Sequence, residues 1–276
     1  MTARPPAQTP GEAAGEVAGG AADEVPGEVP GEVRLPGGNV GGAWKVGQTV
    51  RRTTGPWTPA VHALLAHLEG LRCVPRVHGF DAQGREVLDF LPGRIVDVET
   101  ELLTDAQLVS VARWTRELHE AVAGFSHPGP WRFFGADSPI LVGHNDIAPY
   151  NICFDGDELA GVFDWDLAGP TTPRLELGWL AWQAAPLVRR LPDEWTVRRL
   201  GVLARAYGGE EVDAEALLDA TVDRVELAIR GVLAAVAAGD PGMIALHRTT
   251  GEPEPMRRAL ARLRERLPQL RRLARA

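Results

Sequence analysis

The spacing of hydrophobic and polar positions changes near residue 91, which predicts a chain built of two parts. Before this point, short apolar segments alternate with glycine-rich turns, a pattern typical of β-strands joined by tight connections. One segment that begins at Thr58 and Pro59 instead repeats valine and leucine at helical spacing, with Thr58 as the candidate N-cap. We therefore expect a small antiparallel sheet with one helix. The predicted strands are 43–46, 49–51, 75–80 and 86–91.

Beyond Pro92 and Gly93 the apolar positions recur mostly every three or four residues, which predicts a helical region. A block of strand-like runs and turns at 141–170 interrupts this region. The chain is therefore predicted to be an α+β protein with two lobes, a small antiparallel β-sheet N-lobe at 35–91 and a mostly helical C-lobe at 92–276. The predicted helices of the C-lobe are 104–122, 176–185, 194–207, 214–238 and 255–273.

The first 34 residues consist mainly of alanine, glycine, proline and glutamate, and they contain the near-repeat DEVPGEVPGEV. Such a segment has too few large apolar side chains to offset the entropy that is lost on ordering. We predict that residues 1–34 form a disordered tail.

The composition narrows the class of protein. No apolar run approaches the roughly 20 residues that span a bilayer, and the N-terminus lacks the layout of a signal peptide, so we expect a cytoplasmic protein without a membrane partner. Cys73 and Cys153 have no metal-ligand spacing and are interpreted as inert thiols. The formal charge of −8 argues against nucleic acid as a partner and mildly favours a cationic ligand. The sequence does not decide between a monomer and a homodimer.

The candidate chemistry lies in two strings of the interrupting block, GHNDIAPYNICF at 143–154 and GVFDWDLAGP at 161–170. Phosphoryl transfer needs a group that orients and accepts the proton of the attacking hydroxyl, and oxygen ligands that hold magnesium on the phosphates. Asp146 and Asn151 stand at the two ends of one loop, so their side chains can face one cleft. Asp164, which follows a hairpin with the turn DGDEL, can close on the same metal.

In order and spacing, HNDIAPYN and VFDWD resemble the catalytic and metal-binding motifs of the aminoglycoside phosphotransferase and choline kinase family, which has the protein-kinase fold. The resemblance extends to LHE at 118–120 and to DFLPG at 89–93, which is similar to the linker between the lobes. It implies a kinase that uses ATP or GTP and Mg²⁺ to transfer the γ-phosphate to a hydroxyl group of a small molecule.

Position by position, the resemblance implies that Asp146 is the catalytic base and that Asn151 and Asp164 are magnesium ligands. His144 is expected to support the loop. Asp166 follows Asp164 by two residues and points the same way in an extended segment, so it either assists with the metal or bonds the backbone.

The resemblance also implies a nucleotide site between the lobes. The backbone of Phe90 and Leu91 is expected to meet the adenine, while Gly38 and Gly41 let the first turn approach the phosphates. The family's nucleotide-binding lysine aligns with Arg51, and arginine can also clamp phosphates. Lys45, the only lysine of the chain, is the second choice.

Two further departures concern acidic residues. The helix glutamate that should pair with the nucleotide-binding cation aligns near Val61, so the usual ion pair is expected to be absent. Glu176 stands where the family usually has an aspartate that braces the catalytic loop.

Alternative functions follow from the same residues. The missing ion pair motivates a nucleotide-binding pseudokinase with a regulatory or immunity-type role, although such a role does not require the aspartates and the asparagine. A phosphohydrolase that uses Asp164 and Asp166 would need a different βαβ setting, and turn or cap roles explain each carboxylate singly but not their joint spacing. The acceptor pocket is expected among the C-terminal helices, where the large aromatic residues either line it or pack into the core; they are Trp179, Trp182, Trp195 and Tyr207.

Overall fold

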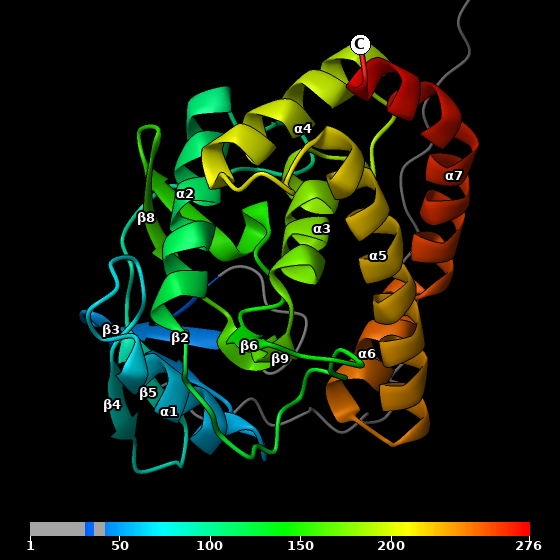
Figure 1. Cartoon of the computed structure of the whole chain (residues 1–276). Coiled ribbons are helices and arrows are strands. Elements are labelled where there is room, and N and C mark those ends of the chain that lie inside the picture. The colour runs from blue at the N-terminus through cyan, green and yellow to red at the C-terminus, as the bar shows by residue number, and fades with distance from the viewer. Residues whose placement is uncertain (1–30, 36–41) are drawn as a thin grey trace, which may run out of the picture.

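The structure, a computed structural model, describes residues 31–35 and 42–276. A five-stranded antiparallel sheet forms one end of the molecule (Figure 1). Its strand order is β1-β2-β3-β5-β4, so the fifth strand of the chain lies between β3 and β4. The strands are β1 (Glu32–Arg34), β2 (Ala43–Val46), β3 (Thr49–Arg52), β4 (Val77–Phe80) and β5 (Glu86–Asp89).

Strand β1 falls within the range that was predicted to be a disordered tail. Glu32 pairs with Val46 across the β1–β2 ladder, and Arg85 Nη2 lies 2.5 Å from Glu32 Oε1. These contacts come from residues far along the chain, which explains why local composition did not predict the strand. The described part of the N-lobe therefore begins before residue 35.

Among the described residues, helix α1 (Thr58–His67) is the single helix of the N-lobe, and it lies beside the sheet (Figure 1). Trp57 occupies the N-cap position that was predicted for Thr58, and Pro59 lies in the first helical turn, where its missing N–H leaves no bond unmade. Leu64 and Leu65 are buried. Burial of such a side chain contributes about 2 kcal/mol, so α1 is held mainly by its apolar face.

The C-lobe is mostly helical, as predicted (Figure 1). Its helices are α2 (Asp105–Ala121), α3 (Pro173–Ala184), α4 (Asp193–Tyr207), α5 (Ala214–Ala237), α6 (Pro241–Thr250) and α7 (Glu254–Ala274). Helix α2 begins with a capping box: the Thr104 side chain accepts from the backbone N–H of Gln107, and the Gln107 side chain accepts from the backbone N–H of Thr104. Helix α6 was not predicted. A Cβ at Gly178 of α3 would lie 2.3 Å from the carbonyl oxygen of Ala220 in α5, so glycine allows these two helices to pack closely.

Two short antiparallel strand pairs bring the candidate motifs together. Strand β6 (Leu141–Gly143) pairs with β9 (Gly169–Thr171), and β7 (Ile152–Asp155) pairs with β8 (Glu158–Val162). The β7–β8 turn contains Gly156 at φ 61°, as the predicted hairpin turn requires. The 3-10 helices η1 (Pro149–Asn151) and η2 (Trp165–Leu167) connect these strands. The ends of the strands thereby position the two polar strings.

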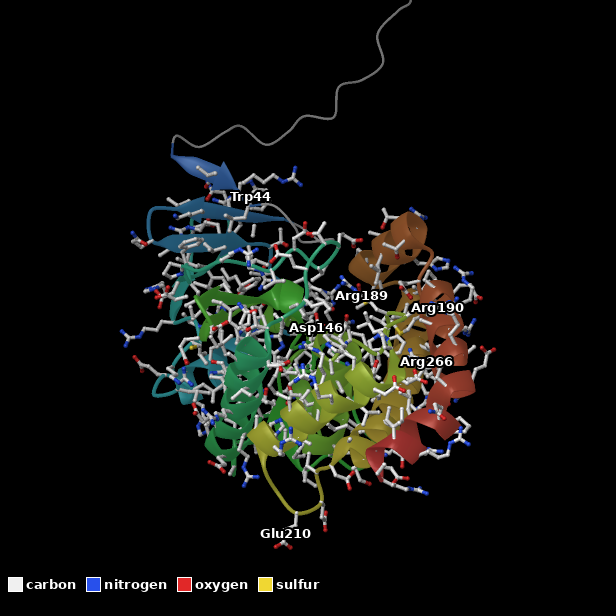
Figure 2. All side chains as sticks on the ribbon, turned by 90° about the horizontal axis from the view of Figure 1, so that it is seen from above. Trp44, Asp146, Arg189, Arg190, Glu210 and Arg266 are labelled. Carbon is white, nitrogen blue, oxygen red and sulfur yellow. The ribbon has the colours of Figure 1, made fainter. Side chains whose placement is uncertain are left out.

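One hydrophobic core runs through both lobes. Leu64 of α1 and Leu118 of α2 belong to the same buried cluster, which extends to Leu263 of α7. Trp114 and Trp165 meet edge to face near its middle, with 6.4 Å between their ring centroids. Figure 2 shows Asp146 near the centre of the molecule, between Trp44 of the sheet and Arg266 of α7 in that view.

Among the described residues, no single helix is long and apolar enough to cross a membrane. Helices α5 and α6 have sufficient length and apolar content only when taken together, and the chain bends by 113° between them.

Candidate active site

Asp146 lies on the loop after β6, and its carboxylate accepts three hydrogen bonds. Oδ1 accepts from Trp179 Nε1 at 2.8 Å and from the Tyr150 hydroxyl at 3.1 Å, while Oδ2 accepts from Asn151 Nδ2 at 2.8 Å. Burial and the nearby charge of Asp164 raise the pKa of Asp146 to about 7. The loop therefore holds an oriented carboxylate whose proton affinity is well above that of an ordinary aspartate.

Asn151 and Asp164 are held close to Asp146 by contacts within and between the two strings. The Nδ2 atom of Asn151 donates to both the backbone oxygen and Oδ2 of Asp146, which fixes the side-chain amide. The backbone N–H of Phe163 donates to the Asn151 carbonyl at 3.0 Å and ties the two strings together. Asp164 adopts left-handed backbone angles of φ 60° and ψ 64°, and its side chain is 41% exposed. Carboxylate and amide oxygens are the donors that magnesium prefers, so this pair fits the ion.

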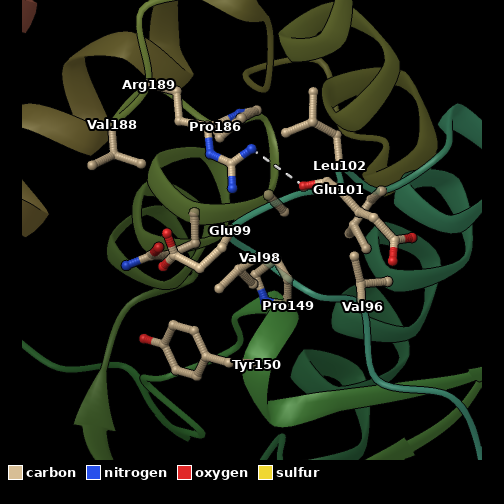
Figure 3. Close-up of a pocket in the computed structure, with 13 residues that line it drawn as sticks. Val96, Val98, Glu99, Glu101, Leu102, Pro149, Tyr150, Pro186, Val188 and Arg189 are labelled. Carbon is tan, nitrogen blue, oxygen red and sulfur yellow. Dashed lines mark hydrogen bonds between the residues drawn. The ribbon is translucent and has the colours of Figure 1, made fainter. Parts of the chain in front are cut away.

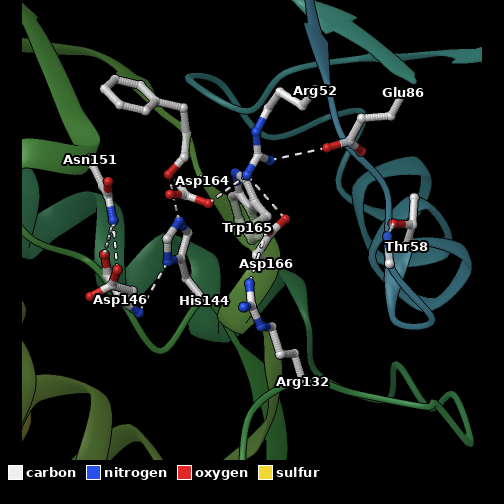
Figure 4. A network of polar contacts seen from close by, with 12 residues as sticks. Arg52, Thr58, Glu86, Arg132, His144, Asp146, Asn151, Asp164, Trp165 and Asp166 are labelled. Atoms are coloured by element: carbon white, nitrogen blue, oxygen red, sulfur yellow. Dashed lines mark hydrogen bonds and ion pairs between the residues drawn. The ribbon is translucent and has the colours of Figure 1, made fainter. Parts of the chain in front are cut away.

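His144 joins the two strings from beneath the loop (Figure 4). Its Nδ1 accepts from the backbone N–H of Asp146 at 3.2 Å, and its Nε2 donates to the carbonyl of Phe163 at 3.1 Å. Burial lowers the pKa of His144, which favours the neutral imidazole that this pattern needs. Its ring also packs on Trp165 at a centroid distance of 4.5 Å. His144 thus supports the loop.

Glu176 of α3 braces the same loop from the C-lobe core. Its Oε1 accepts from the backbone N–H of Asn145 at 2.7 Å, and its Oε2 lies 2.7 Å from His119 Nε2. His119 is the central residue of the LHE string, and its Nδ1 contacts the Tyr207 hydroxyl at 2.8 Å. Burial alone would raise the pKa of Glu176, but the hydrogen bonds from His119 and Asn145 and the histidine charge lower it. Glu176 therefore contacts the catalytic loop directly, at the position where the resemblance implied an aspartate.

Arg224 of α5 supports the opposite side of Asn145. Its Nη2 donates to the Asn145 carbonyl at 2.8 Å, and its guanidinium lies 4.5 Å from the ring centroid of Trp179, the residue that donates to Asp146. Burial lowers the pKa of Arg224 to about 10. Within the described part of the chain, its Nε and Nη1 have no hydrogen-bond partner. Asn145 itself has φ 63°, so this strained residue is held from both sides.

Arg52 crosses from the N-lobe to the second string (Figure 4). Its Nη2 lies 2.7 Å from Asp164 Oδ1 and 3.1 Å from Asp166 Oδ1, and its Nη1 lies 3.1 Å from Glu86 Oε1. Burial alone would lower the pKa of Arg52, but the charges of the three carboxylates raise it above its ordinary value. Glu86 is buried and also contacts His62 of α1 through Nε2 at 2.9 Å. Arg52 therefore joins the buried Glu86 of the sheet to Asp164 and Asp166 of the second string.

Asp166 is shared between two arginines. Besides Arg52, it contacts Arg132 Nη1 at 3.5 Å, and Arg132 in turn binds Asp240 at 3.0 Å and lies over the Trp57 ring at 4.4 Å. Among the described residues, the Asp166 side chain forms these ion pairs and no hydrogen bond to the backbone, which was one of the two contacts considered from the sequence. The chain of charges links the sheet, the second string and the start of α6.

The linker between the lobes continues from the end of β5 and contacts the turn between β2 and β3. The backbone N–H of Phe90 donates to the Gln48 carbonyl at 2.9 Å, and Lys45 Nζ lies 4.0 Å from the centroid of the Phe90 ring. Leu91 Cβ would lie 2.6 Å from a Cβ at Gly161, so the linker passes close to β8. Gly38 and Gly41 lie outside the described residues.

The sequence of this region also matches a known family. Residues 135–220, which include Asp146, Asn151 and Asp164, match the profile of the family described as "Phosphotransferase enzyme family". The resemblance to this phosphotransferase family is confirmed. The rest of the chain carries the fold that goes with it, as similar structures show.

A trifolitoxin immunity protein from Rhizobium leguminosarum bv. trifolii is 34% identical to this chain over 163 residues. That match covers 55% of this chain and 62% of the relative, so it spans less than two thirds of the relative's length. A choline/ethanolamine kinase family protein from Mesorhizobium loti has 17% identity and a TM-score of 0.53, covering 88% of this chain and 94% of the other. The GDP complex of aminoglycoside 2'-phosphotransferase-IIIa has 14% identity and a TM-score of 0.52, covering 85% and 94%. These structures establish the two-lobed α+β kinase-like fold that was predicted.

Arg52, rather than the predicted Arg51, is the arginine of β3 that contacts Asp164. Arg51 does not reach the cleft: its Nη1 donates to Thr49 at 2.6 Å, and its Nε lies 3.8 Å from Asp81. Successive side chains of a strand point to opposite faces, so the register of one residue decides which arginine faces Asp164. Arg52 has that position.

Glu86 and His62 were missed by sequence reasoning. Glu86 stands directly opposite Arg52 in the β3–β5 ladder, and cross-strand neighbours of opposite charge attract each other. The predicted absence of a glutamate on the helix holds, since His62 rather than a carboxylate contacts the pair from α1. The only usable signal was the glutamate at the start of the predicted strand 86–91.

Proposed function

We propose that this chain is an ATP- or GTP-dependent kinase that transfers the γ-phosphate to a hydroxyl group of a small molecule. The observation that carries the proposal is the joint geometry of Asp146, Asn151 and Asp164. One carboxylate is oriented by three donors, and the amide and the second carboxylate lie beside it at the ends of two strings that are tied together. Turn or cap roles would not need this convergence.

Asp146 is the proposed catalytic base. A carboxylate with a pKa near 7 has enough proton affinity to accept the hydroxyl proton of the acceptor as the oxygen attacks phosphorus. The hydrogen bonds from Trp179 and Tyr150 to Oδ1 fix the direction in which the carboxylate faces. Positioning of the attacking hydroxyl is a main requirement of phosphoryl transfer.

Asn151 and Asp164 are the proposed magnesium ligands. The Asn151 amide is oriented because its nitrogen donates twice to Asp146, which leaves Oδ1 as the atom that would contact the ion. When bound, Mg²⁺ would neutralise part of the charge of the phosphates. The exposed side chain of Asp164 supplies the charged oxygen of the pair.

Arg52 is the proposed phosphate-binding cation in place of Arg51. Its guanidinium is fixed by Glu86 and already lies beside Asp164, where the phosphates would bind. The linker backbone at Phe90 and Leu91 remains the proposed adenine contact, and Gly38 and Gly41 remain the proposed phosphate-turn residues. Lys45, which lies over the Phe90 ring, belongs to the adenine side of the cleft under this assignment.

The experiment that tests this function begins with binding of ATP and GTP, with and without magnesium, measured by calorimetry. It continues with phosphate transfer to hydroxyl compounds that include aminoglycosides, choline-like amines and sugars. We expect binding in the presence of magnesium and transfer to at least one acceptor. Asp146→Asn should lower the transfer rate by a factor of about 100 or more while changing nucleotide affinity little. Unchanged transfer by that variant would contradict the assigned role.

A second candidate function is a nucleotide-binding protein with an immunity role. The similarity to a trifolitoxin immunity protein favours it, because that name describes protection rather than a reaction. Transfer activity separates the candidates: a binding protein retains its protective effect in the Asp146→Asn variant, whereas an enzyme loses protection together with transfer. A cell-survival assay with that toxin, run on both forms of the chain, gives the comparison.

A further inference from the structure

A cavity of about 260 Å³ lies beside the catalytic loop, and we call it the loop pocket (Figure 3). Its walls come from the segment after the linker, from the catalytic loop, and from the segment between α3 and α4. The lining is mostly apolar and includes Val96, Val98, Leu103, Pro149, Tyr150 and Val188. Small-molecule sites typically have such walls, with a few polar groups that set orientation.

The loop pocket is connected to the candidate base through one side chain. Tyr150 lines one end of the pocket, and its hydroxyl donates to Asp146 Oδ1 at 3.1 Å. The other carboxylate oxygen of Asp146 faces Asn151. Of the residues proposed to bind the nucleotide, the three that the structure describes are absent from the pocket lining; they are Arg52, Phe90 and Leu91. The base therefore stands between the nucleotide residues and the loop pocket, as transfer from one to the other requires.

The rim of the loop pocket leaves apolar surface in solvent. The side chains of Tyr150 and Val188 are 40% and 36% exposed, and both belong to the lining. A second hollow, between α2 and α4, is larger, at about 570 Å³, but its lining includes three arginines and two acidic residues and no residue of the catalytic loop. Position beside the base, rather than size, distinguishes the loop pocket.

The charges around the loop pocket nearly balance. Glu101 pairs through its carboxylate with Arg94, and its carbonyl accepts from Arg189 Nη1 at 3.2 Å. Glu99 lines the pocket, and within residues 31–35 and 42–276 its carboxylate forms no ion pair. Besides Glu101, whose carboxylate is paired with Arg94, the lining thus carries one carboxylate, that of Glu99, and one guanidinium, that of Arg189. A polycation would need several unpaired carboxylates to offset the loss of its hydration.

We propose that the loop pocket binds the acceptor, and that the acceptor is an alcohol with a compact apolar body and at most a single charge of either sign, rather than a polycation. This inference rests on the proposed function and names its substrate class. In the reaction, the acceptor oxygen forms a bond to the γ-phosphorus and its proton passes to Asp146. The bond from the γ-phosphorus to the bridging oxygen breaks, and the nucleoside diphosphate leaves with that electron pair.

The test uses the full chain with valine methyl groups labelled for NMR and with magnesium and a non-hydrolysable ATP analogue present. Benzyl alcohol serves as the probe, because it is a neutral alcohol with a compact apolar body. We expect it to shift the methyl signals of Val96, Val98 and Val188. Val98→Trp, which fills the pocket, should raise the dissociation constant of the probe about tenfold or more. Val109→Trp, in the hollow between α2 and α4, is the matched control and should leave it unchanged.

The outcomes separate the pocket from the function. Three results would overturn the inference. The methyl shifts could be confined to other parts of the chain, or no shifts could occur up to the solubility limit of benzyl alcohol. The third is an equal effect of the two tryptophan variants on the dissociation constant of the probe. Displacement of benzyl alcohol by gentamicin would overturn the substrate class. Nucleotide binding is measured by calorimetry on the same samples: its loss, with the methyl shifts retained, would count against the proposed function and not against the pocket.

Discussion

At the scale of single residues, the site depends on side chains that hold other side chains. Asp146 is oriented by Trp179, and Trp179 is covered by the Arg224 guanidinium, which also binds the loop backbone at Asn145. Arg52 reaches Asp164 because Glu86 fixes its other end. Interactions of this kind restrict the reacting groups to one geometry, which is the main contribution a protein makes to phosphoryl transfer.

The two neighbouring arginines of β3 give a residue-scale prediction. Arg52→Ala should raise the dissociation constant of magnesium–ATP about tenfold or more, because it removes a cation beside Asp164. Arg51→Ala, one residue away and paired with Asp81 on the other face, should change it less than about threefold. Calorimetry on both variants measures the difference. An equal or reversed order would mean that the nucleotide does not use the cation of this face.

What the sequence could predict at this scale depended on whether the signal was local. The Asp146, Asn151 and Asp164 set lies in short strings whose order is visible directly, and the structure gathers all three. The choice between Arg51 and Arg52 depended on strand register, which is decided by pairing with β5 and by burial. Glu86 acquires its partner only through that pairing, so no local pattern could have predicted it.

At the scale of elements, α3 and α5 are the helices that hold the catalytic loop. Glu176 of α3 accepts from the backbone N–H of Asn145 and contacts His119 of α2. Arg224 of α5 donates to the carbonyl of the same asparagine. The close contact at Gly178 keeps these two helices at a fixed separation. The loop is therefore supported by three helices whose spacing is set by packing.

Glu176 gives an element-scale prediction with a pH dependence. Its pKa is lower in the folded chain than in the unfolded chain, so its ionised form stabilises the fold above the unfolded pKa, and this contribution is lost as the pH falls through the folded pKa. Glu176→Gln should lower the free energy of unfolding by about 2 kcal/mol at pH 7. The difference from the unmodified chain should narrow below about pH 4. Urea unfolding at several pH values measures it.

Glu120→Gln is the matched control for this measurement. Glu120 is exposed and pairs with Arg116 one helical turn away. Such surface pairs contribute about 0.5 kcal/mol, so the control should change stability little at any pH. A Glu176→Gln effect no larger than that of the control would mean that the buried carboxylate does not brace the loop.

Helix α6 and strand β1 were not predicted from the sequence, for different physical reasons. Helix α6 begins with Pro241 and Gly242, which are turn signals in a sequence, yet Asp240 caps it by accepting from the Met243 N–H at 2.9 Å. Strand β1 has little apolar content and forms through pairing with β2. The long helices were predictable because their apolar stripes repeat over many turns, while short elements depend on one cap or one partner strand.

At the scale of the whole molecule, α7 reaches the loop pocket from the far end of the chain. Arg266 donates to the carbonyls of Arg189 and Leu191 and to the carboxylate of Asp193. Figure 2 shows Arg189, Arg190 and Arg266 on the same side of the molecule. The arginine-rich last helix is therefore more than a charged surface, since one of its side chains shapes the segment that walls the pocket.

Arg266→Ala gives the whole-molecule prediction. Loss of these hydrogen bonds should loosen the segment between α3 and α4 and weaken benzyl alcohol binding several-fold, with magnesium–ATP affinity unchanged. Arg264→Ala, on the same helix, should have no effect on either ligand, because within the described residues Arg264 forms an ion pair only with the exposed Glu226. NMR titration and calorimetry measure the two affinities. Equal probe binding by both variants would show that α7 does not shape the pocket.

The shared hydrophobic core has a consequence for how this chain can be divided. Leu64, Leu65 and Leu68 of the N-lobe belong to the same buried cluster as the helices of the C-lobe. A fragment cut at the linker would expose these leucines to water. Each half would then have an exposed hydrophobic surface, prone to aggregation, where it had contacted the other half. The two lobes therefore cannot be exchanged as independent units. Grafting this sheet onto the helices of another kinase-like protein would require redesign of the buried hydrophobic contact between the lobes as well as of the proposed site.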